Sequence, residues 1–158
     1  MSKRVEEAIE RFGSGGVFLT AGDNVMTVGW GQFGIMWGKQ VFVAAIRPSR
    51  YTDSLVQQTK QFTLSVPAMG ELSGELAFVG TKSGRELDKW SACCLTKQKA
   101  KSVDTFVVEG CKHYFECKVL TKLPLKQEEI PSLDLRWYPT GDDYHNLYIA
   151  EIVESYGN

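Results

Sequence analysis

Two arginines and three hydroxyl-bearing residues occur together in the segment 47–52 (RPSRYT), directly after an apolar stretch. Guanidinium groups offer paired N–H donors that match phosphate oxygens. Thr52 stands where it could cap a helix over 53–59, and the free amides at a helix start attract anions. The segment therefore predicts a phosphate site. The alternative is a solvated loop in which the arginines pair with surface carboxylates.

A second group of cations surrounds another predicted helix start, in the segment 80–90 (GTKSGRELDKW). Ser83 followed by Glu86 has the spacing of a capping box and predicts a helix over 85–92. Lysines and an arginine bring positive charge to the same place, so the two loops together could bind one dianionic phosphate. Neither loop ends as a Walker P-loop does, which argues against nucleoside triphosphate chemistry.

The segment 29–34 (GWGQFG) matches the GxGxxG pattern of dinucleotide-binding folds. In those folds the glycines open a helix, whereas here they lead within a few residues into the apolar stretch 41–46, leaving no room for a crossover helix. The pattern therefore indicates a glycine-rich turn between strands and not a nicotinamide dinucleotide site.

Other catalytic and metal-binding patterns are weak. His113 lies on an apolar strand face, where a hydrogen-bonded structural histidine is expected. His145, at the start of the last strand, is the better functional candidate, the alternative being a polar residue beside a turn. The four cysteines have no CxxC spacing. We therefore expect reduced, semi-buried thiols and no metal site.

The elements that must position these groups are mostly strands. Strands are predicted at 17–20, 25–30, 41–46, 62–66, 113–120 and 144–153, and helices at 3–12, 53–59 and 85–92. The stretch 41–46 is apolar at every position, so a helix or a second subunit should cover its outer face. The stretch 113–120 alternates, which predicts one wet face. One β-barrel-like domain with peripheral helices, covering 1–158, is the expected fold.

Length, charge and composition exclude some classes of protein. The chain has 158 residues, 18 basic and 19 acidic side chains and a formal net charge of −1. It lacks the basic footprint of nucleic-acid binding. The charged first twelve residues do not form a signal peptide or a membrane span. We therefore expect a cytoplasmic protein with neither nucleic acid nor membrane as a partner.

Four segments resemble, in order and spacing, the flavin reductase-like FMN-binding proteins, which include the flavoredoxins. They are 24–30 (NVMTVGW), 46–52 (IRPSRYT), 80–90 (GTKSGRELDKW) and 115–119 (FECKV). The likeness covers most of the chain from residue 16 onward. It implies a mainly β fold, a six-stranded split β-barrel with short peripheral helices, and a homodimer with FMN held near the subunit interface.

The resemblance also implies which residues bind the cofactor. Toward the flavin ring and ribityl chain it places Asn24, Met26 and Thr27. Toward the phosphate and ribityl chain it places Arg47, Ser49, Arg50, Tyr51, Thr52, Ser83 and Lys89. The carboxyl-terminal motif departs from the family's Gly-Asp-His run, because Tyr144 precedes His145 and Ala150 stands where a glycine is usual. A nicotinamide-side role for His145 therefore stays open.

In such a protein the hydride chemistry belongs to the flavin, so no catalytic side chain is assigned. The expected function is that of an FMN-binding flavoprotein, an NAD(P)H-dependent flavin oxidoreductase with NADH or NADPH as co-substrate. The alternatives are a flavoredoxin-type electron carrier with a redox partner protein, or an FMN-binding or FMN-sensing module without turnover.

Overall fold

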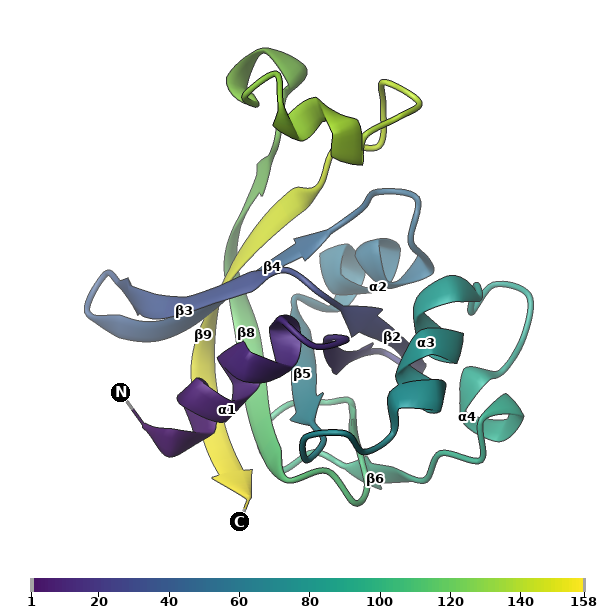
Figure 1. Cartoon of the computed structure of the whole chain (residues 1–158). Helices are drawn as coiled ribbons and strands as arrows, with labels where there is room; N and C mark the ends of the chain where they lie inside the picture. The colour runs from purple at the N-terminus through teal and green to yellow at the C-terminus, as the bar shows by residue number, and fades with distance from the viewer. Residues whose placement is uncertain (1, 158) are drawn as a thin grey trace.

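A curved antiparallel sheet and a small separate hairpin form the framework of the computed structural model, which describes residues 2–157 (Figure 1). The strands are β1 (Val17–Ala21), β2 (Asn24–Val28), β3 (Gly31–Met36), β4 (Lys39–Ile46), β5 (Gln61–Val66), β6 (Lys97–Lys99), β7 (Phe106–Val108), β8 (His113–Pro124) and β9 (Asn146–Gly157). The main sheet has seven strands in the order β2-β1-β5-β8-β9-β4-β3, and β6 pairs with β7.

The expected six-stranded barrel is wrong in strand number and in closure. The main sheet has seven strands, and its edge strands β2 and β3 do not pair with each other. The additional strand is the glycine-rich segment, which pairs with β4 from Gly31 opposite Ala44 to Met36 opposite Lys39. The expected turn at 29–34 is therefore mostly strand. A Cβ at Gly31 would overlap the ring of Phe42, so glycine lets β3 lie close to the core.

Short helices lie around the sheet. They are α1 (Lys3–Phe12), α2 (Tyr51–Thr59), α3 (Ser73–Thr81), α4 (Lys89–Ala92) and the 3₁₀ helices η1 (Gln127–Glu129) and η2 (Asp134–Trp137). The expected helix at 3–12 is confirmed, and the one at 53–59 is confirmed with a start two residues earlier. The expected helix at 85–92 is wrong over its first four positions, which form turns. Helix α3 was not predicted, because its sequence alternates small and apolar residues without a charged face.

Strand β8 is covered on both faces over its first half, which contradicts the expected wet face. Glu116 is fully buried, and its carboxylate accepts hydrogen bonds from the backbone N–H groups of Lys101 (2.7 Å), Ser102 (2.6 Å) and Val103 (3.2 Å). The Tyr156 hydroxyl donates a fourth bond at 2.8 Å. Because backbone donors satisfy the carboxylate, an acidic residue fits an interior position.

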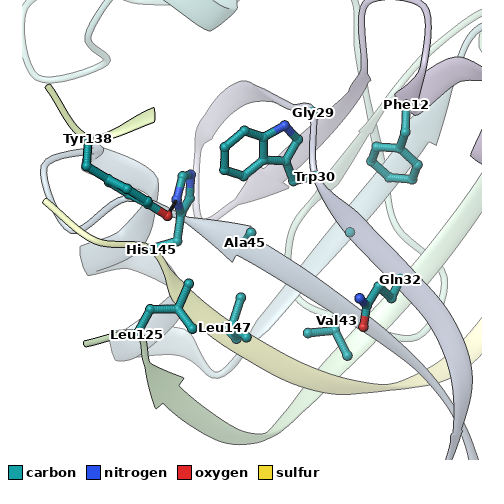
Figure 2. A pocket seen from close by; sticks show the side chains of 11 residues that line it. Phe12, Gly29, Trp30, Gln32, Val43, Ala45, Leu125, Tyr138, His145 and Leu147 are labelled. Atoms are coloured by element: carbon teal, nitrogen blue, oxygen red, sulfur yellow. Dashed lines mark hydrogen bonds between the residues drawn. The ribbon is translucent and has the colours of Figure 1, made fainter. Parts of the chain in front are cut away.

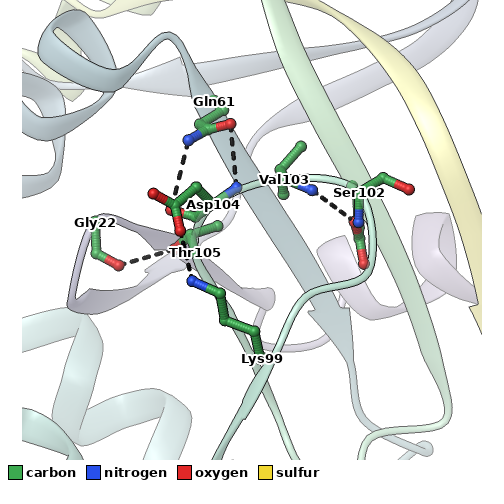
Figure 3. Close-up of polar contacts among 8 residues, drawn as sticks. Gly22, Gln61, Lys99, Ser102, Val103, Asp104 and Thr105 are labelled. Atoms are coloured by element: carbon green, nitrogen blue, oxygen red, sulfur yellow. Dashed lines mark hydrogen bonds and ion pairs between the residues drawn. The ribbon is translucent and has the colours of Figure 1, made fainter.

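Hydrogen bonds also hold the C-terminal end of the loop that supplies these donors (Figure 3). The Gln61 side chain accepts from the Asp104 N–H at 3.2 Å and donates to the Asp104 carbonyl at 3.4 Å. The Thr105 hydroxyl donates to the Gly22 carbonyl at 2.9 Å. The loop before β7 thus covers the face of β8 that alternation alone assigns to solvent.

Strand β4 is fully buried on one face and partly covered on the other. Phe42, Ala44 and Ile46 are fully buried in the core; on the outer face Val41 is 3% exposed, whereas Val43 and Ala45 are half-buried. The expected cover over the outer face is therefore only partial within the described part of this single chain. Strands β8 and β9 extend together away from the core and carry the segment 125–145 at their ends (Figure 1). No helix among residues 2–157 is long and apolar enough to span a membrane.

Candidate functional site

The ten binding residues expected from the sequence line two adjoining cavities. The first, of about 160 Å³, is lined by Asn24, Ser49, Arg50, Tyr51, Thr52, Ser83 and Lys89, together with Thr81, Lys82 and Gly84. The second, of about 310 Å³, is lined by Met26, Thr27 and Arg47, and it shares Arg50 with the first. We call them the cation cavity and the ring cavity.

The start of α2 forms one wall of the cation cavity. Arg50 occupies the N-cap position, and no side chain caps the helix. The first amides of a helix have no acceptor within the helix, so those of Tyr51 and Thr52 are free to bind an anion. The expected capping role of Thr52 is wrong. Its hydroxyl is fully buried and accepts from the Asn24 side-chain amide at 2.8 Å, which ties α2 to β2.

A buried carboxylate fixes the first turn of α2 against β9. Asp53 is 3% exposed and accepts from the Tyr148 hydroxyl (2.6 Å), the Asn146 amide (3.0 Å) and the Gln57 amide (2.7 Å). Burial and the hydrogen bond to Asp53 raise the pKa of Tyr148, which keeps its phenol protonated. Sequence reasoning missed this network, because it joins residues more than ninety positions apart.

Two cations, half-buried Arg50 and buried Lys89, meet at the end of α3. Arg50 donates to the carbonyls of Gly80 (2.9 Å) and Val79 (3.3 Å), and the Lys89 ammonium donates to the Val79 carbonyl at 2.8 Å. Lys89 is only 2% exposed. Within residues 2–157 neither cation has a carboxylate oxygen within 4 Å.

Positive charge exceeds negative charge where Arg50 and Lys89 meet the end of α3. A helix C-terminus carries about half a negative charge, whereas Arg50 and Lys89 bring two positive charges and the α2 start adds positive potential. Burial, together with the nearby Arg50 charge, lowers the pKa of Lys89 to about 8. Burial also lowers the pKa of Arg50. The described residues around the cation cavity thus leave an excess of positive charge, which a bound anion would offset.

The loop before α4 lines the cation cavity, but no helix begins at Ser83. The expected capping box at Ser83 is wrong: the Ser83 hydroxyl accepts from the Arg85 N–H at 3.2 Å, and α4 begins at Lys89 with Asp88 as its cap. Asp88 accepts from the Trp90 N–H at 3.0 Å, so the helix is capped five residues later than expected. A Cβ on Gly84 would overlap the Asn24 amide, which shows how closely the loop packs.

Arg47 and Ser49 hold the segment that follows η2. Arg47 donates to the carbonyls of Trp137 (2.8 Å) and Asp143 (3.3 Å). The Asp143 carboxylate accepts from the Ser49 N–H (2.9 Å) and hydroxyl (2.6 Å). The segment therefore crosses the ring cavity beside Arg47. Asp143 and Trp137 were missed, because no local pattern links them to a turn ninety positions earlier.

The two histidines have separate surroundings. His113 is 1% exposed, and its Nε2 lies 2.6 Å from a Glu7 carboxylate oxygen, so the expected structural role is confirmed. His145 lines the ring cavity, and its Nδ1 shares a 2.6 Å hydrogen bond with the Tyr138 hydroxyl. Burial, reinforced by the Arg47 charge, lowers the pKa of His145 to about 4, which leaves the imidazole uncharged near neutral pH.

The described part of the chain contains no group of side chains that could bind a metal ion. Among residues 2–157 no cluster of three histidine, cysteine, aspartate or glutamate side chains could hold an ion. Cys111 and Cys117 are buried, and burial raises the pKa of the Cys111 thiol to about 12. The cavities must therefore be understood through their cations, hydrogen bonds and aromatic walls.

Most of the chain matches one known protein family. The family described as "Flavin reductase like domain" matches residues 9–158. An uncharacterized protein of Archaeoglobus fulgidus is 30% identical over 130 residues, which are 82% of this chain and 63% of that protein. The chain thus spans less than two thirds of the length of that relative.

Solved structures of low sequence identity share the fold. Flavoredoxin of Desulfovibrio vulgaris (Miyazaki F) superposes with a TM-score of 0.70 at 18% identity, covering 90% of this chain and 68% of that one. An FMN-binding protein from Thermus thermophilus superposes with a TM-score of 0.69 at 19% identity, covering 89% and 68%.

The buried Lys89 predicts an unusual pH dependence of stability in the absence of a bound anion. Its pKa is about 8 in the folded protein against 10.5 ordinarily, so between these values the unfolded chain binds more protons. The free energy of unfolding should therefore rise with pH from about 8 to 10.5. Urea unfolding over this range measures the rise. Lys89→Met should flatten it and Lys82→Met, on the exposed loop, should not; equal slopes in all three proteins would contradict the assignment.

Proposed function

The chain belongs to the flavin reductase-like family, and from this premise we propose that it binds FMN with the terminal phosphate in the cation cavity. The observation that carries the proposal is the pair of cations, half-buried Arg50 and buried Lys89, with no carboxylate oxygen within 4 Å among the described residues. A phosphate dianion supplies the missing negative charge and accepts several hydrogen bonds at once.

Phosphate donors come from two elements. The free amides of Tyr51 and Thr52 at the α2 start, the Ser83 hydroxyl and the Arg50 and Lys89 side chains line the cation cavity. The Arg50 fork also reaches the ring cavity, so it would bridge the phosphate and the ribityl chain. Asn24 positions the helix start through Thr52.

The flavin ring is proposed to lie in the ring cavity. Met26 and Thr27 come from edge strand β2, whose outer backbone groups have no partner strand. The Thr27 hydroxyl already donates to the Leu76 carbonyl at 2.6 Å, so its contact with the cofactor is through the backbone. Trp30 and Trp137 meet edge to face, with ring centroids 5.2 Å apart, and wall the cavity.

FMN supplies hydride and electron transfer when bound, and the chain supplies binding, orientation and exclusion of water. We propose that the protein is an NAD(P)H-dependent flavin oxidoreductase with NADH or NADPH as electron donor. The second candidate is an electron carrier that receives electrons from a redox partner protein, and the fold similarity to a flavoredoxin favours it. An FMN-binding or FMN-sensing module without turnover is the third.

We also propose a homodimer, because large apolar side chains are exposed on the open side of the sheet. At the β3–β4 turn, Ile35 is 69% and Trp37 65% exposed, and Leu123 on β8 is 51% exposed. The outer face of β4 is only partly covered within residues 2–157. Apolar exposure of this kind marks a protein contact, and a second copy would bury it.

The phosphate assignment predicts that the protein discriminates FMN from riboflavin. Charge-assisted hydrogen bonds contribute about 1.5–3 kcal/mol each, so losing two should weaken binding by roughly a hundredfold or more. Fluorescence titration measures both affinities. Arg50→Ala should weaken FMN binding much more than riboflavin binding, because both flavins carry the ribityl chain and only FMN carries the phosphate. Equal affinities for the two flavins in the native protein would refute the placement.

Reduction of the bound flavin under anaerobic conditions distinguishes a reductase from an electron carrier or a binding module. FMN-loaded protein is mixed with NADH or NADPH, and the flavin absorbance is followed. Bleaching within seconds is the expected result for a reductase. Flavin that is inert to both nicotinamides but is reduced by dithionite would instead indicate a carrier or binding module. Failure to load FMN at all would overturn the proposed function.

The dimer is tested by light scattering at micromolar concentration. We expect twice the chain mass for the native protein, and a shift toward the monomer in Trp37→Ser, because that side chain loses apolar contact area. Leu133→Ser, at an exposed position of the segment 125–145, is a matched control outside the proposed contact. A monomeric native protein at this concentration would contradict the proposed homodimer.

A further inference from the structure

The Lys89 side chain is enclosed by two adjoining cavities. It is only 2% exposed, yet it lines the cation cavity and also a cavity of about 380 Å³. The two cavities share Asn24, Tyr51, Gly84 and Lys89. A small molecule that enters either cavity therefore meets the Lys89 side chain, although bulk water hardly does.

One hydrogen bond holds the amine of Lys89. Within residues 2–157 its Nζ donates only to the Val79 carbonyl, at 2.8 Å. An ammonium has three N–H donors and no lone pair, whereas the neutral amine has two donors and one lone pair. A neutral Lys89 can therefore keep its bond to Val79 and still offer its lone pair to a bound molecule.

The surroundings of Lys89 favour its neutral, nucleophilic form. Burial, together with the Arg50 charge, lowers its pKa to about 8. At pH 7.5 this leaves roughly a quarter of the amine unprotonated, against about one part in a thousand for a lysine with the ordinary pKa of 10.5. A desolvated lysine beside a second cation is a known way of making a nucleophilic amine.

The cation cavity suits a small anion. Arg50 lines it beside Lys89, and the uncapped start of α2 contributes to its wall. Its volume of about 160 Å³ is below the range of drug-sized pockets, about 300–1,000 Å³. A phosphate bound there would hold the group attached to it close to the Lys89 amine.

Charge directs an anion to this cavity and not to the neighbouring space. A cavity of about 420 Å³ adjoins the ring cavity, and Figure 2 shows its largely aromatic and aliphatic walls. We call it the apolar cavity. No lysine, arginine, aspartate or glutamate lines it. An anion there would lose its hydration without a partner of opposite charge, which is costly.

We propose that Lys89 is an acylation site for small acyl phosphates, whose phosphate binds beside Arg50 in the cation cavity. The Lys89 amine attacks the carbonyl carbon and forms an N–C bond. The C–O bond to the phosphate breaks, and its electron pair leaves with the phosphate. The amine proton goes to the phosphate, which departs as hydrogen phosphate. The site rests on the anion cavity of the proposed function but needs no flavin.

Binding favours this reaction in spite of the phosphate charge. A phosphate beside Lys89 stabilises the ammonium form and so lowers the neutral fraction. Holding both groups in one cavity acts in the opposite direction, because effective concentrations of well-oriented groups reach on the order of 10⁵ M. We expect the second effect to be the larger.

Acylation would couple the supply of acyl phosphate to flavin binding. An amide carries no charge, so the acylated side chain loses the charge-assisted hydrogen bond to a phosphate. If FMN binds as proposed, the acylated protein should bind it at least about tenfold more weakly.

The test uses acetyl phosphate, with acetic anhydride as a donor of the same acyl group without phosphate. FMN-free full-length protein is treated with each, and peptide mass spectrometry measures acetylation at every lysine. Exposed Lys118 and Lys126, which line neither cavity around Lys89, are the reference. The ratio of Lys89 to reference acetylation should be at least about tenfold higher with acetyl phosphate. Equal ratios, or preferential acetylation of Lys82, would overturn the proposal.

Two arginine variants locate the bound phosphate. Arg50→Ala removes the guanidinium beside Lys89 and should lower this ratio at least about tenfold. Arg85→Ala removes an exposed guanidinium that does not line the cation cavity, and it should leave the ratio nearly unchanged. An equal loss in both variants would show attraction by the general positive potential and would refute the site.

Protection of the native protein supplies a test that does not depend on the folding of a variant. Inorganic phosphate at millimolar concentration should slow acetylation of Lys89 by acetyl phosphate and leave Lys118 unaffected. Equal rates with and without inorganic phosphate would overturn the proposal.

Titration with FMN separates this proposal from the proposed function. Protection of Lys89 by inorganic phosphate, with no uptake of FMN, would refute FMN binding and leave the acylation site standing. FMN binding by a protein whose Lys89 stays unreactive when FMN-free would refute the acylation site alone. Unchanged FMN affinity after acetylation of Lys89 would refute the coupling between the two.

Discussion

The site depends on two positive charges, buried Lys89 and half-buried Arg50, that meet at the C-terminal end of α3. Arg50 and Lys89 reach the same carbonyl, that of Val79, from two different segments of the chain. Their contacts join the start of α2, the end of α3 and the start of α4 around one small space. The helix end offsets only part of the charge, so this part of the fold keeps an excess of positive charge among the described residues.

The surrounding sheet makes that arrangement rigid. Asp53 anchors α2 to β9 by two hydrogen bonds, and Asn24 anchors it to β2 through Thr52. Strands β2 and β9 do not pair with each other in the sheet, so α2 bridges separate parts of it. A change in sheet curvature would therefore move the Arg50 guanidinium relative to Lys89, and the anion site shares the stability of the core.

Chemistry divides along the cation cavity, the ring cavity and the apolar cavity. Positive charge is confined to the cation cavity and its boundary, where Arg50 and Arg47 face the ring cavity. Beyond Trp30 and His145 the walls become uncharged. Charged and uncharged walls are thus separated along the site.

The sequence by itself determined the strand-rich fold, the amphipathic α1 helix, the rejection of a dinucleotide fold and the grouping of Arg50 with Lys89, because these follow from local periodicity, glycine context and charge. The six-stranded count, the wet face of β8 and the Ser83 capping box were wrong for a common reason. Each depends on contacts made by other parts of the chain. Pairing with β4 makes the segment at Gly31 a strand, and the loop at 101–103 covers Glu116 on β8. Asp88, and not Ser83, caps α4. Only the tertiary structure decided that Asp53, Asp143 and Tyr138 belong to the site, since hydrogen bonds between distant positions leave no local pattern.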